Sequence, residues 1–232
     1  CSGYATAVIS PLVAMLASAG EVVVTEWTDA RLVPAAAGPF GLAQQIELGL
    51  AAARMLDGPA HLLALSQSGP AGLAVATLLA RQEPGRTPAS LAFLGCQLDP
   101  VRAPSALQQV LAPWPRDLLA AQLTSPVSAA YPGAGRWVYP AVLQLLAYSV
   151  ASPQLYAEVQ GGLLRELAAG EIGGYERLHA DIHSLADVPA ELFLDMLDWM
   201  RDDGAWTGRA TEIAGVEVDL GLRSEEHTSE LQ

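Results

Sequence analysis

The chain of 232 residues contains no lysine, and charged residues of any kind are scarce at 16%. Its 12 basic residues are all arginine, and they face 25 acidic residues, which gives a net charge of −13. A chain this acidic lacks the basic surface that coats nucleic acid or an anionic membrane. The composition therefore predicts no nucleic-acid partner.

Cysteine is equally scarce, with only Cys1 and Cys96. Two thiols cannot form a disulfide scaffold, which fits a reducing, cytoplasmic compartment. No apolar run is long enough to cross a bilayer, so no membrane span is expected. Hydrophobic residues nevertheless make up 51% of the chain, and the mean hydropathy is +0.28. That excludes a disordered polar chain and predicts a core of ordinary size.

The first part of the chain alternates apolar runs with helical patterns. Continuous apolar or β-branched runs predict strands, and apolar residues at helical spacing predict helices. The predicted strands are 21–27, 61–65 and 90–94, and the predicted helices are 42–57 and 69–81. Strands and helices that alternate at these spacings predict an α/β fold with a parallel sheet and right-handed crossovers.

Beyond this part, residues 97–205 show helical patterns and no convincing strand. The clearest helix begins at Pro189, with apolar residues on one face and Asp195 and Asp198 turned outward. A helical block inserted into an α/β sheet is typical of a lid over an active site. Residues 216–218 are expected to begin a return to the sheet.

These patterns divide the chain into segments. We expect the N-terminal part of an α/β core at 1–96, a helical lid at 97–205 and the start of a return to the core at 206–222. Residues 223–232 match the translation of a common sequencing adapter, so we expect them to be an artefact. On this interpretation the natural protein is truncated at both ends.

The most informative motif is residues 64–69, Ala-Leu-Ser-Gln-Ser-Gly, which joins a predicted strand to a predicted helix. It approximates the G-x-S-x-G nucleophile elbow, with Ala64 and Ser68 at the glycine positions, and both are small enough for the tight turn. Ser66 is then the nucleophile, and the backbone N–H of Gln67 helps to form an oxyanion hole. The alternative is that Ser66 only caps the helix through its hydroxyl.

Three further stretches resemble signatures of the intracellular polyhydroxyalkanoate (polyhydroxybutyrate) depolymerases. They are residues 27–40 (WTDARLVPAAAGPF), residues 131–145, which begin YPGAGRWVYP, and residues 187–195 (DVPAELFLD). They occur in the order that the family has. The resemblance implies an α/β-hydrolase fold with a helical lid, and hydrolysis of 3-hydroxyacyl esters through an acyl-enzyme. It implies a polyester or hydroxyacyl-ester substrate, a place in the cytoplasm or at a polyester granule, and no cofactor.

The resemblance also assigns roles to single residues. The family has a cysteine nucleophile at the position of Ser66, and a serine depends more on a general base. Residues 2–4, Ser-Gly-Tyr, resemble the loop that supplies the other oxyanion donor, so Gly3 and Tyr4 join Gln67 in the predicted oxyanion hole. The family's catalytic acid and histidine belong to a C-terminal part beyond this sequence. We therefore expect the chain as given to turn over very slowly, if at all.

Two aromatic residues of the predicted lid, Trp137 and Tyr139, are candidates for substrate binding, because an apolar surface there can contact a polyester chain. The alternative is that they belong to the core of the lid. The nearby run 133–135, Gly-Ala-Gly, invites a phosphate-loop interpretation. No strand precedes it, so we interpret it as a turn.

The remaining candidates have ordinary structural explanations. Cys96 competes for the role of nucleophile, but a half-buried small hydrophobe is favoured. His61 precedes the elbow strand and is interpreted as structural. His179 and His183 are four residues apart and can hold a metal on one helix face, yet no third ligand accompanies them, which favours a pair of lid side chains. Asp99 as a catalytic acid is less favoured than an Asx turn.

Two alternatives to the hydrolase remain. A polyester synthase-like acyltransferase needs a thiol nucleophile, so Ser66 counts against it. A non-catalytic granule-binding protein with a decayed hydrolase fold is permitted by the change from cysteine to serine. Labelling of Ser66 by a fluorophosphonate in a complete protein would favour the hydrolase.

Overall fold

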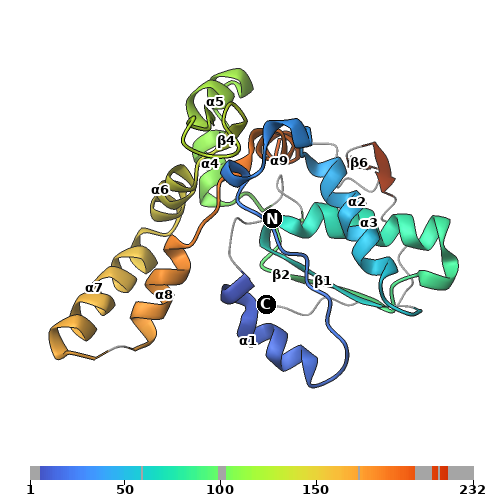
Figure 1. Cartoon of the computed structure of the whole chain (residues 1–232), viewed down its shortest axis with the longest axis horizontal. Helices are drawn as coiled ribbons and strands as arrows, with labels where there is room; N and C mark the ends of the chain where they lie inside the picture. Colours follow the sequence, from blue (N-terminus) through green and yellow to red (C-terminus); the bar gives the residue numbers. More distant parts are fainter. Residues whose placement is uncertain are drawn as a thin grey trace.

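A computed structural model of the chain describes residues 6–58, 60–98, 103–171, 173–201, 211–213 and 215–218. The α-helices are α1 (Thr6–Ala17), α2 (Leu42–Arg54), α3 (Gly69–Gln82), α4 (Ala106–Leu111), α5 (Arg116–Leu123), α6 (Ala141–Ala151), α7 (Pro153–Ala169), α8 (Gly174–His183) and α9 (Ala190–Trp199). The strands are β1 (His61–Leu65), β2 (Ser90–Leu94), β3 (Ser125–Pro126), β4 (Trp137–Tyr139), β5 (Val188–Pro189), β6 (Thr211–Ile213) and β7 (Val216–Val218). Single turns of 3₁₀ helix are Ala30–Leu32, Ala35–Ala37, Ser66–Ser68 and Pro84–Arg86. The molecule is therefore a mixed α/β protein dominated by helices (Figure 1).

A parallel pair of strands, β1 and β2, forms the centre of the first half of the chain. The pair runs in register from His61 opposite Ser90 to Leu65 opposite Leu94. Helix α3 connects the two strands, and α2 packs beside α3 (Figure 1). The predicted strands 61–65 and 90–94, their parallel pairing and the helix between them are confirmed.

The strand predicted at residues 21–27 does not form. This stretch runs without helix, turn or bend, but it belongs to no sheet within the described residues. Its valines, Val22, Val23 and Val24, are half-buried. The β-branched pattern identified a run that suits a strand, but a strand also needs a hydrogen-bonded neighbour, and no described segment pairs with this run.

A second correction concerns residues 97–205, where no strand was expected. β3, β4 and β5 form a small antiparallel sheet with β4 in the middle. Val138 of β4 is buried there with Ala30 and Val127. Strands of two or three residues are shorter than any window in which an alternating pattern can be recognised.

The predicted return of residues 216–218 to the parallel sheet is also wrong. They form β7, which pairs with β6 as an antiparallel hairpin and not with β1 or β2. The hairpin lies against α3, where Arg81 donates a hydrogen bond to the Glu217 carbonyl at 2.7 Å. Ile213 of β6 is buried in the core.

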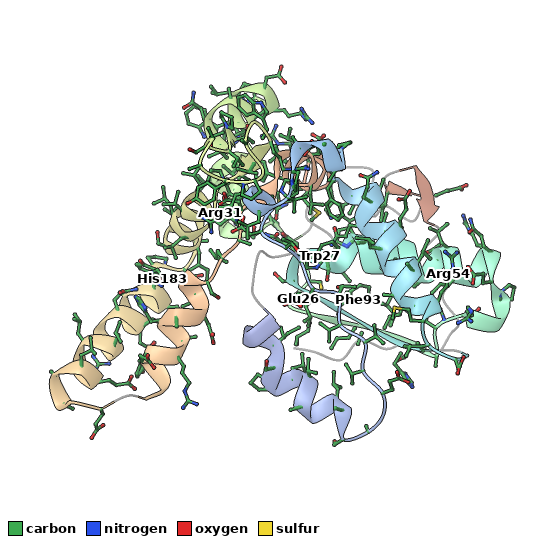
Figure 2. The ribbon with its side chains drawn as sticks, viewed as in Figure 1. Glu26, Trp27, Arg31, Arg54, Phe93 and His183 are labelled. Carbon is green, nitrogen blue, oxygen red and sulfur yellow. The ribbon has the colours of Figure 1, made fainter. Side chains whose placement is uncertain are left out.

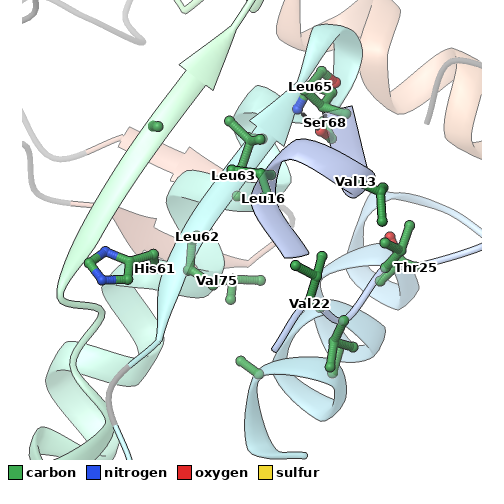
Figure 3. Close-up of a pocket in the computed structure, with 18 of the residues that line it drawn as sticks. Val13, Leu16, Val22, Thr25, His61, Leu62, Leu63, Leu65, Ser68 and Val75 are labelled. Atoms are coloured by element: carbon green, nitrogen blue, oxygen red, sulfur yellow. Dashed lines mark hydrogen bonds between the residues drawn. The ribbon is translucent and has the colours of Figure 1, made fainter. Parts of the chain in front are cut away.

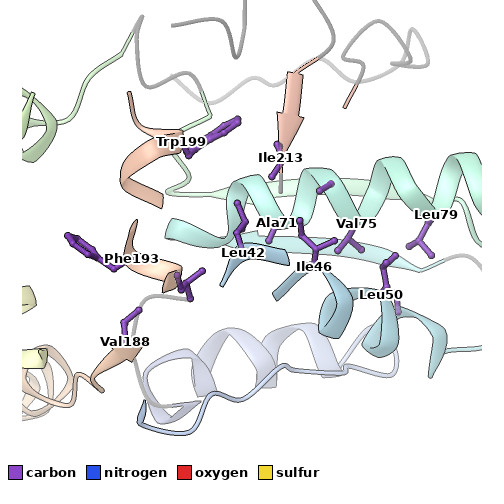
Figure 4. Close-up of a cluster of buried hydrophobic side chains, with 13 residues drawn as sticks. Leu42, Ile46, Leu50, Ala71, Val75, Leu79, Val188, Phe193, Trp199 and Ile213 are labelled. Atoms are coloured by element: carbon purple, nitrogen blue, oxygen red, sulfur yellow. The ribbon is translucent and has the colours of Figure 1, made fainter. Parts of the chain in front are cut away.

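The main core lies where α2, α3 and α9 meet (Figure 4). Its larger buried side chains include Leu42, Ile46, Leu50, Val75, Leu79, Leu192, Phe193 and Trp199. The helix predicted from Pro189 is confirmed, since α9 begins one residue later. Chain segments about 150 residues apart thus share one core.

Of the two aspartates predicted on the outer face of α9, one has another role. Asp198 is exposed and pairs with Arg116 at 2.6 Å. Asp195 instead accepts a hydrogen bond from the backbone N–H of Leu42 at 2.7 Å. That N–H belongs to the first turn of α2, so α9 supplies a cap that α2 lacks in its own sequence, where Gly41 precedes the helix.

Helices α6, α7 and α8 form an arm that extends away from the parallel pair of strands (Figure 1). Among the described residues, no helix combines the length and the apolar character that a bilayer crossing requires.

Candidate active site at the end of β1

Ser66, the predicted nucleophile, lies at the carboxyl end of β1, in the 3₁₀ turn that leads into α3. Its φ is +51°, and it is the only non-glycine residue with a positive φ in the described part of the chain. In that region the Cβ of an L-residue crowds its own backbone, which costs about 1–3 kcal/mol. A strained residue between a strand and a helix is the geometry of a nucleophile elbow.

Small residues let α3 approach the sheet closely behind Ser66. A Cβ on Gly72 would lie 2.8 Å from the Cβ of Ala64, and a Cβ on Gly69 would lie 3.0 Å from that of Cys96. Ala64 itself is buried. The tight turn therefore depends on the small residues at 64, 69 and 72, as the sequence motif predicts for position 64.

The hydroxyl of Ser68 closes the turn. It accepts a hydrogen bond from the Leu65 N–H at 2.8 Å and lies 2.7 Å from the Leu65 carbonyl, to which it donates. Both bonds bring the end of β1 back onto the start of α3. Ser68 is thereby committed to the backbone, which leaves Ser66 as the serine available for chemistry.

The Ser66 hydroxyl makes no hydrogen bond to any described residue. Ser66 is half-buried, and the Gln67 N–H comes next in the turn. That N–H lies at the amino end of α3, where the helix dipole favours negative charge. The arrangement can offer one oxyanion donor beside the nucleophile, which is the role predicted for Gln67.

No histidine of the described residues contacts Ser66. His61 occupies the opposite end of β1, about 16 Å away for five residues of strand, and its Nδ1 lies 2.7 Å from the Ser90 hydroxyl. His183 lies on the arm, well apart from Phe93 of β2 (Figure 2). None of the described histidines is therefore placed to act as the general base that a serine nucleophile needs.

The two arm histidines form a structural pair. Their rings stack with centroids 3.9 Å apart, and His183 Nδ1–H donates to the His179 carbonyl at 2.8 Å. Desolvation, followed by the neighbouring His183, lowers the pKa of His179. No group of three or more histidine, cysteine, aspartate or glutamate side chains able to hold a metal occurs in the part of the chain that the structure describes.

Cys96 follows β2 and lies against the start of α3. Its thiol donates to the Ala64 carbonyl at 3.2 Å and is half-buried. Desolvation raises the pKa of Cys96, so the thiolate that a nucleophile requires is disfavoured. The geometry fits the interpretation of Cys96 as a small packing residue.

The two aromatic candidates lie on the middle strand of the antiparallel sheet. Trp137 is 54% exposed, whereas Tyr139 is half-buried and stacks on Phe193 with ring centroids 4.2 Å apart. Their role in substrate binding stays a prediction. Trp137 has the exposure for it, and Tyr139 packs against the main core.

Burial raises the pKa of Tyr139 to about 12. In the unfolded chain this tyrosine ionises near pH 10, so the folded state loses stability as the pH rises from about 10 to 12. Tyr139→Phe removes the ionising group. We therefore expect the wild type to lose about 1.4 kcal/mol in free energy of unfolding, relative to Tyr139→Phe, between pH 9 and pH 11. Urea denaturation of both proteins at the two pH values measures this shift. An unchanged difference would show that Tyr139 titrates normally.

The other predicted site residues, Gly3, Tyr4 and Asp99, lie outside the described residues.

The three stretches that carry the family resemblance meet in the structure, although 90 or more residues separate the first from the others. The Ala30 N–H donates to the Asp187 carbonyl at 3.1 Å, and the Gly133 N–H donates to the Arg31 carbonyl at 2.8 Å. Val138 of β4 pairs with Pro189 of β5. The motifs thus form one connected region and are not independent surface features.

Sequence reasoning missed the residue at the centre of this region, Arg136. It is 6% exposed, and its guanidinium donates to the carbonyls of Val33, Pro34 and Gly38 at 3.2, 2.9 and 3.0 Å. A buried arginine held by carbonyls alone has no sequence pattern of its own. The Gly133–Arg136 turn is the one interpreted above as a simple turn, and that interpretation holds.

No family model matches the chain, and no curated protein or solved structure is significantly similar to it.

Proposed function

We propose that this chain carries the nucleophile of a carboxylic ester hydrolase, with Ser66 as the attacking residue. The observation that supports this most is the φ of +51° at Ser66, in the connection from β1 to α3. A helix cap needs no positive φ, because capping residues adopt ordinary extended backbone. The strain therefore favours the nucleophile over the cap.

The proposed chemistry has two steps. The Ser66 hydroxyl attacks the ester carbonyl, its proton passes to a base, and the alcohol leaves to give an acyl-enzyme. Water then releases the acid and restores the serine. The Gln67 N–H stabilises the negative oxygen that forms in each step.

We propose that the substrate is a 3-hydroxyacyl ester of the polyhydroxyalkanoate type. The protein would then act in the compartment where such polymers are stored. The proposed reaction needs no cofactor. This part of the proposal rests on the resemblance of residues 27–40, 131–145 and 187–195. Their convergence in space supports it, because stretches that share a function are expected to share a region.

The proposal also predicts weak ester hydrolysis by the chain of 232 residues. A serine hydroxyl is far from ionised at neutral pH, and no histidine of the described residues reaches it. A test should therefore use a nucleophile that does not depend on a base. A thiol, with an ordinary pKa near 8.5, ionises without help in mildly alkaline solution.

We expect Ser66→Cys, made in a background with Cys1→Ser and Cys96→Ala, to react with p-nitrophenyl 3-hydroxybutyrate. The thiolate attacks the carbonyl, p-nitrophenolate leaves, and a thioester remains at position 66. The release should approach one equivalent per chain and should rise with pH as the thiol ionises. Absorbance of p-nitrophenolate measures the burst, and mass spectrometry locates the acyl group.

Ser68→Cys in the same background is the matched control, because position 68 lies in the same turn with its side chain directed at Leu65. Acylation should be at least about tenfold faster at position 66, which corresponds to about 1.4 kcal/mol in the barrier. Equal rates at the two positions would contradict the elbow. A rate with p-nitrophenyl butyrate equal to that with the hydroxyacyl ester would contradict the substrate class alone.

The second candidate is a non-catalytic binding protein built on a hydrolase-like core. It is favoured because no histidine of the described residues contacts Ser66. It predicts binding of 3-hydroxybutyrate oligomers with no acylation at position 66 even after Ser66→Cys. Binding together with acylation favours the hydrolase.

A further inference from the structure

The hydroxyl of Ser68 has an unusual orientation for a serine at the start of a helix. Ser68 directly precedes α3 and is its N-cap residue, where a serine usually accepts a hydrogen bond from the second or third N–H of the helix. Here the side chain makes no such bond. The second helical residue is Pro70, which has no N–H, and the third is Ala71. The hydroxyl is therefore not used to cap α3.

The hydroxyl instead turns back to Leu65, the residue before the proposed nucleophile. It accepts from the Leu65 N–H at 2.8 Å and donates to the Leu65 carbonyl at 2.7 Å, so one side chain binds both backbone groups of that residue. Figure 3 shows the two residues together, where β1 ends and beside a cavity of about 620 Å³, far along the strand from His61. Leu65 is thereby fixed at the point where the chain leaves the strand.

These two hydrogen bonds enclose Ser66 and Gln67, the proposed nucleophile and the proposed oxyanion donor. Leu65, before them, is extended with φ −112° and ψ 131°, and Gly69, after Ser68, is already helical with φ −51° and ψ −55°. The change of direction therefore falls on residues 66–68 and includes the positive φ of Ser66. Strained backbone persists only where surrounding contacts hold it. The Ser68 hydroxyl supplies such contacts across the strained residue.

We propose that Ser68 is a positioning residue for the reaction at Ser66. Its hydroxyl holds the Ser66 side chain and the Gln67 N–H in the relative placement that nucleophilic attack and stabilisation of the oxyanion require. Because it does not cap α3, it also leaves the positive end of the helix dipole free to face the developing negative charge. This inference rests on the proposed function of Ser66. It gives a role to the serine that replaces the second glycine of the elbow motif.

The alternative is that Ser68 only stabilises the turn. A stabilising contact changes the fraction of molecules that are folded, but it does not change how fast a folded molecule reacts. A positioning contact changes the rate of the step that needs the placement and leaves other reactions of the same side chain unchanged. The two roles therefore differ in measurements made on folded protein.

The first test uses the full 232-residue chain with Ser66→Cys, Cys1→Ser and Cys96→Ala, to which Ser68→Ala or Ser68→Thr is added. Ser68→Ala removes the hydroxyl and keeps the Cβ, whereas Ser68→Thr keeps the hydroxyl. The thiolate attacks p-nitrophenyl 3-hydroxybutyrate, p-nitrophenolate leaves and a thioester remains at position 66. We expect Ser68→Ala to slow this acylation at least about tenfold, with a burst still near one equivalent per chain, and Ser68→Thr to stay within about threefold of the serine.

Alkylation by iodoacetamide provides the matched measurement in the same proteins. The thiolate at position 66 displaces iodide from a saturated carbon and no oxyanion forms, so this rate depends on the exposure and ionisation of the thiol. Ser68→Ala should change the alkylation rate by less than about twofold. Equal slowing of acylation and alkylation would show that Ser68 controls only access to the thiol, and would overturn the inference.

A double-mutant cycle measures the same contact without any reaction, in a chain that is otherwise unchanged. Ser66→Gly should raise the midpoint of urea denaturation where Ser68 holds the turn, since glycine adopts a positive φ without strain. In the Ser68→Ala chain the turn is free to relax, so the same gain should shrink by at least about half. Ala92→Gly is the control, because it lies in β2 outside the turn and should have the same effect with and without Ser68→Ala.

Slow acylation with Ser68→Ala, recovery with Ser68→Thr and a reduced gain from Ser66→Gly together support the positioning role. Unchanged acylation with Ser68→Ala, or a full gain from Ser66→Gly without the hydroxyl, would overturn it. So would equal slowing by Ser68→Thr at an unchanged urea midpoint, because the shape of the side chain and not its hydroxyl would then matter. If no chain is acylated at position 66, the proposed function fails, and the double-mutant cycle alone decides whether Ser68 holds the strained turn.

Discussion

Replacing Gly133 with alanine should lower the free energy of unfolding by about 3–5 kcal/mol. An added Cβ would lie 2.8 Å from the carbonyl oxygens of Ala30 and Arg31 and 2.9 Å from that of Val33. These are backbone atoms, so no side-chain rotation relieves the contact. The chain must separate there, and the hydrogen bond from the Gly133 N–H to the Arg31 carbonyl is lost with it.

Urea denaturation measures this loss. We expect unfolding at a lower urea concentration, with an unchanged dependence of the free energy of unfolding on urea. Gly174→Ala is the control for an alanine without a clash, because nothing lies within 4 Å of its Cβ, and it should change stability by less than about 1 kcal/mol. Gly135→Ala adds only the strain of a φ of +81°, and about 1 kcal/mol is expected. If Gly133→Ala lowers the free energy of unfolding no more than Gly135→Ala does, the close contact at Gly133 is not present in solution.

The large effect expected at Gly133 follows from what the contact holds. The buried guanidinium of Arg136 binds the 33–38 loop, and the Arg31 guanidinium lies 5.5 Å from the centre of the Tyr131 ring. Hydrogen bonds from a charged donor are stronger than neutral ones, and here they have three backbone acceptors. Separation at Gly133 would loosen all of these contacts and β4 with them.

Local patterns predicted the parts of the fold that depend on neighbouring residues. The β1–α3–β2 unit was predicted because each element has its own apolar period and a short connection fixes the pairing. Helix α9 was predicted because a proline precedes it and one face is apolar. In these elements the local preference and the tertiary contacts agree.

The failures share one cause, which is dependence on residues distant in the sequence. Residues 21–27 have the composition of a strand and no paired neighbour. β4 exists because segments about 12 and 50 residues away lie beside it, and neither is visible from its three residues. The capping role of Asp195 was missed for the same reason, because the N–H that it binds belongs to Leu42, 153 residues away in the sequence.

The candidate site shows the same division. The connection from β1 to α3 is local, so the motif at 64–69 predicted the strand-to-helix turn in which Ser66 lies. The positive φ at Ser66 was not predicted from the sequence. The base and the second oxyanion donor come from other parts of a chain, and no local pattern among the described residues supplies them.

The last prediction uses stability to ask whether Ser66 is kept for function. Ser66→Gly should raise the free energy of unfolding by about 1 kcal/mol, since glycine adopts a positive φ without strain. Ser66→Val should lower it by about 2 kcal/mol, because a β-branched side chain fits this region worst. Urea denaturation of the three proteins gives the order glycine, serine, valine.

Ala92→Gly gives the control, because Ala92 lies in β2 with extended backbone and a glycine there should lower stability by about 0.5–1 kcal/mol. Opposite signs at positions 66 and 92 would show that the serine is less stable than the residue that best suits its backbone. A helix cap gives no reason to retain such a residue, since its hydroxyl bonds to no described group. A nucleophile does, because the strained turn holds the hydroxyl clear of the backbone and next to an N–H donor. If Ser66→Gly lowers stability instead, the strain is absent and the main argument for the elbow is lost.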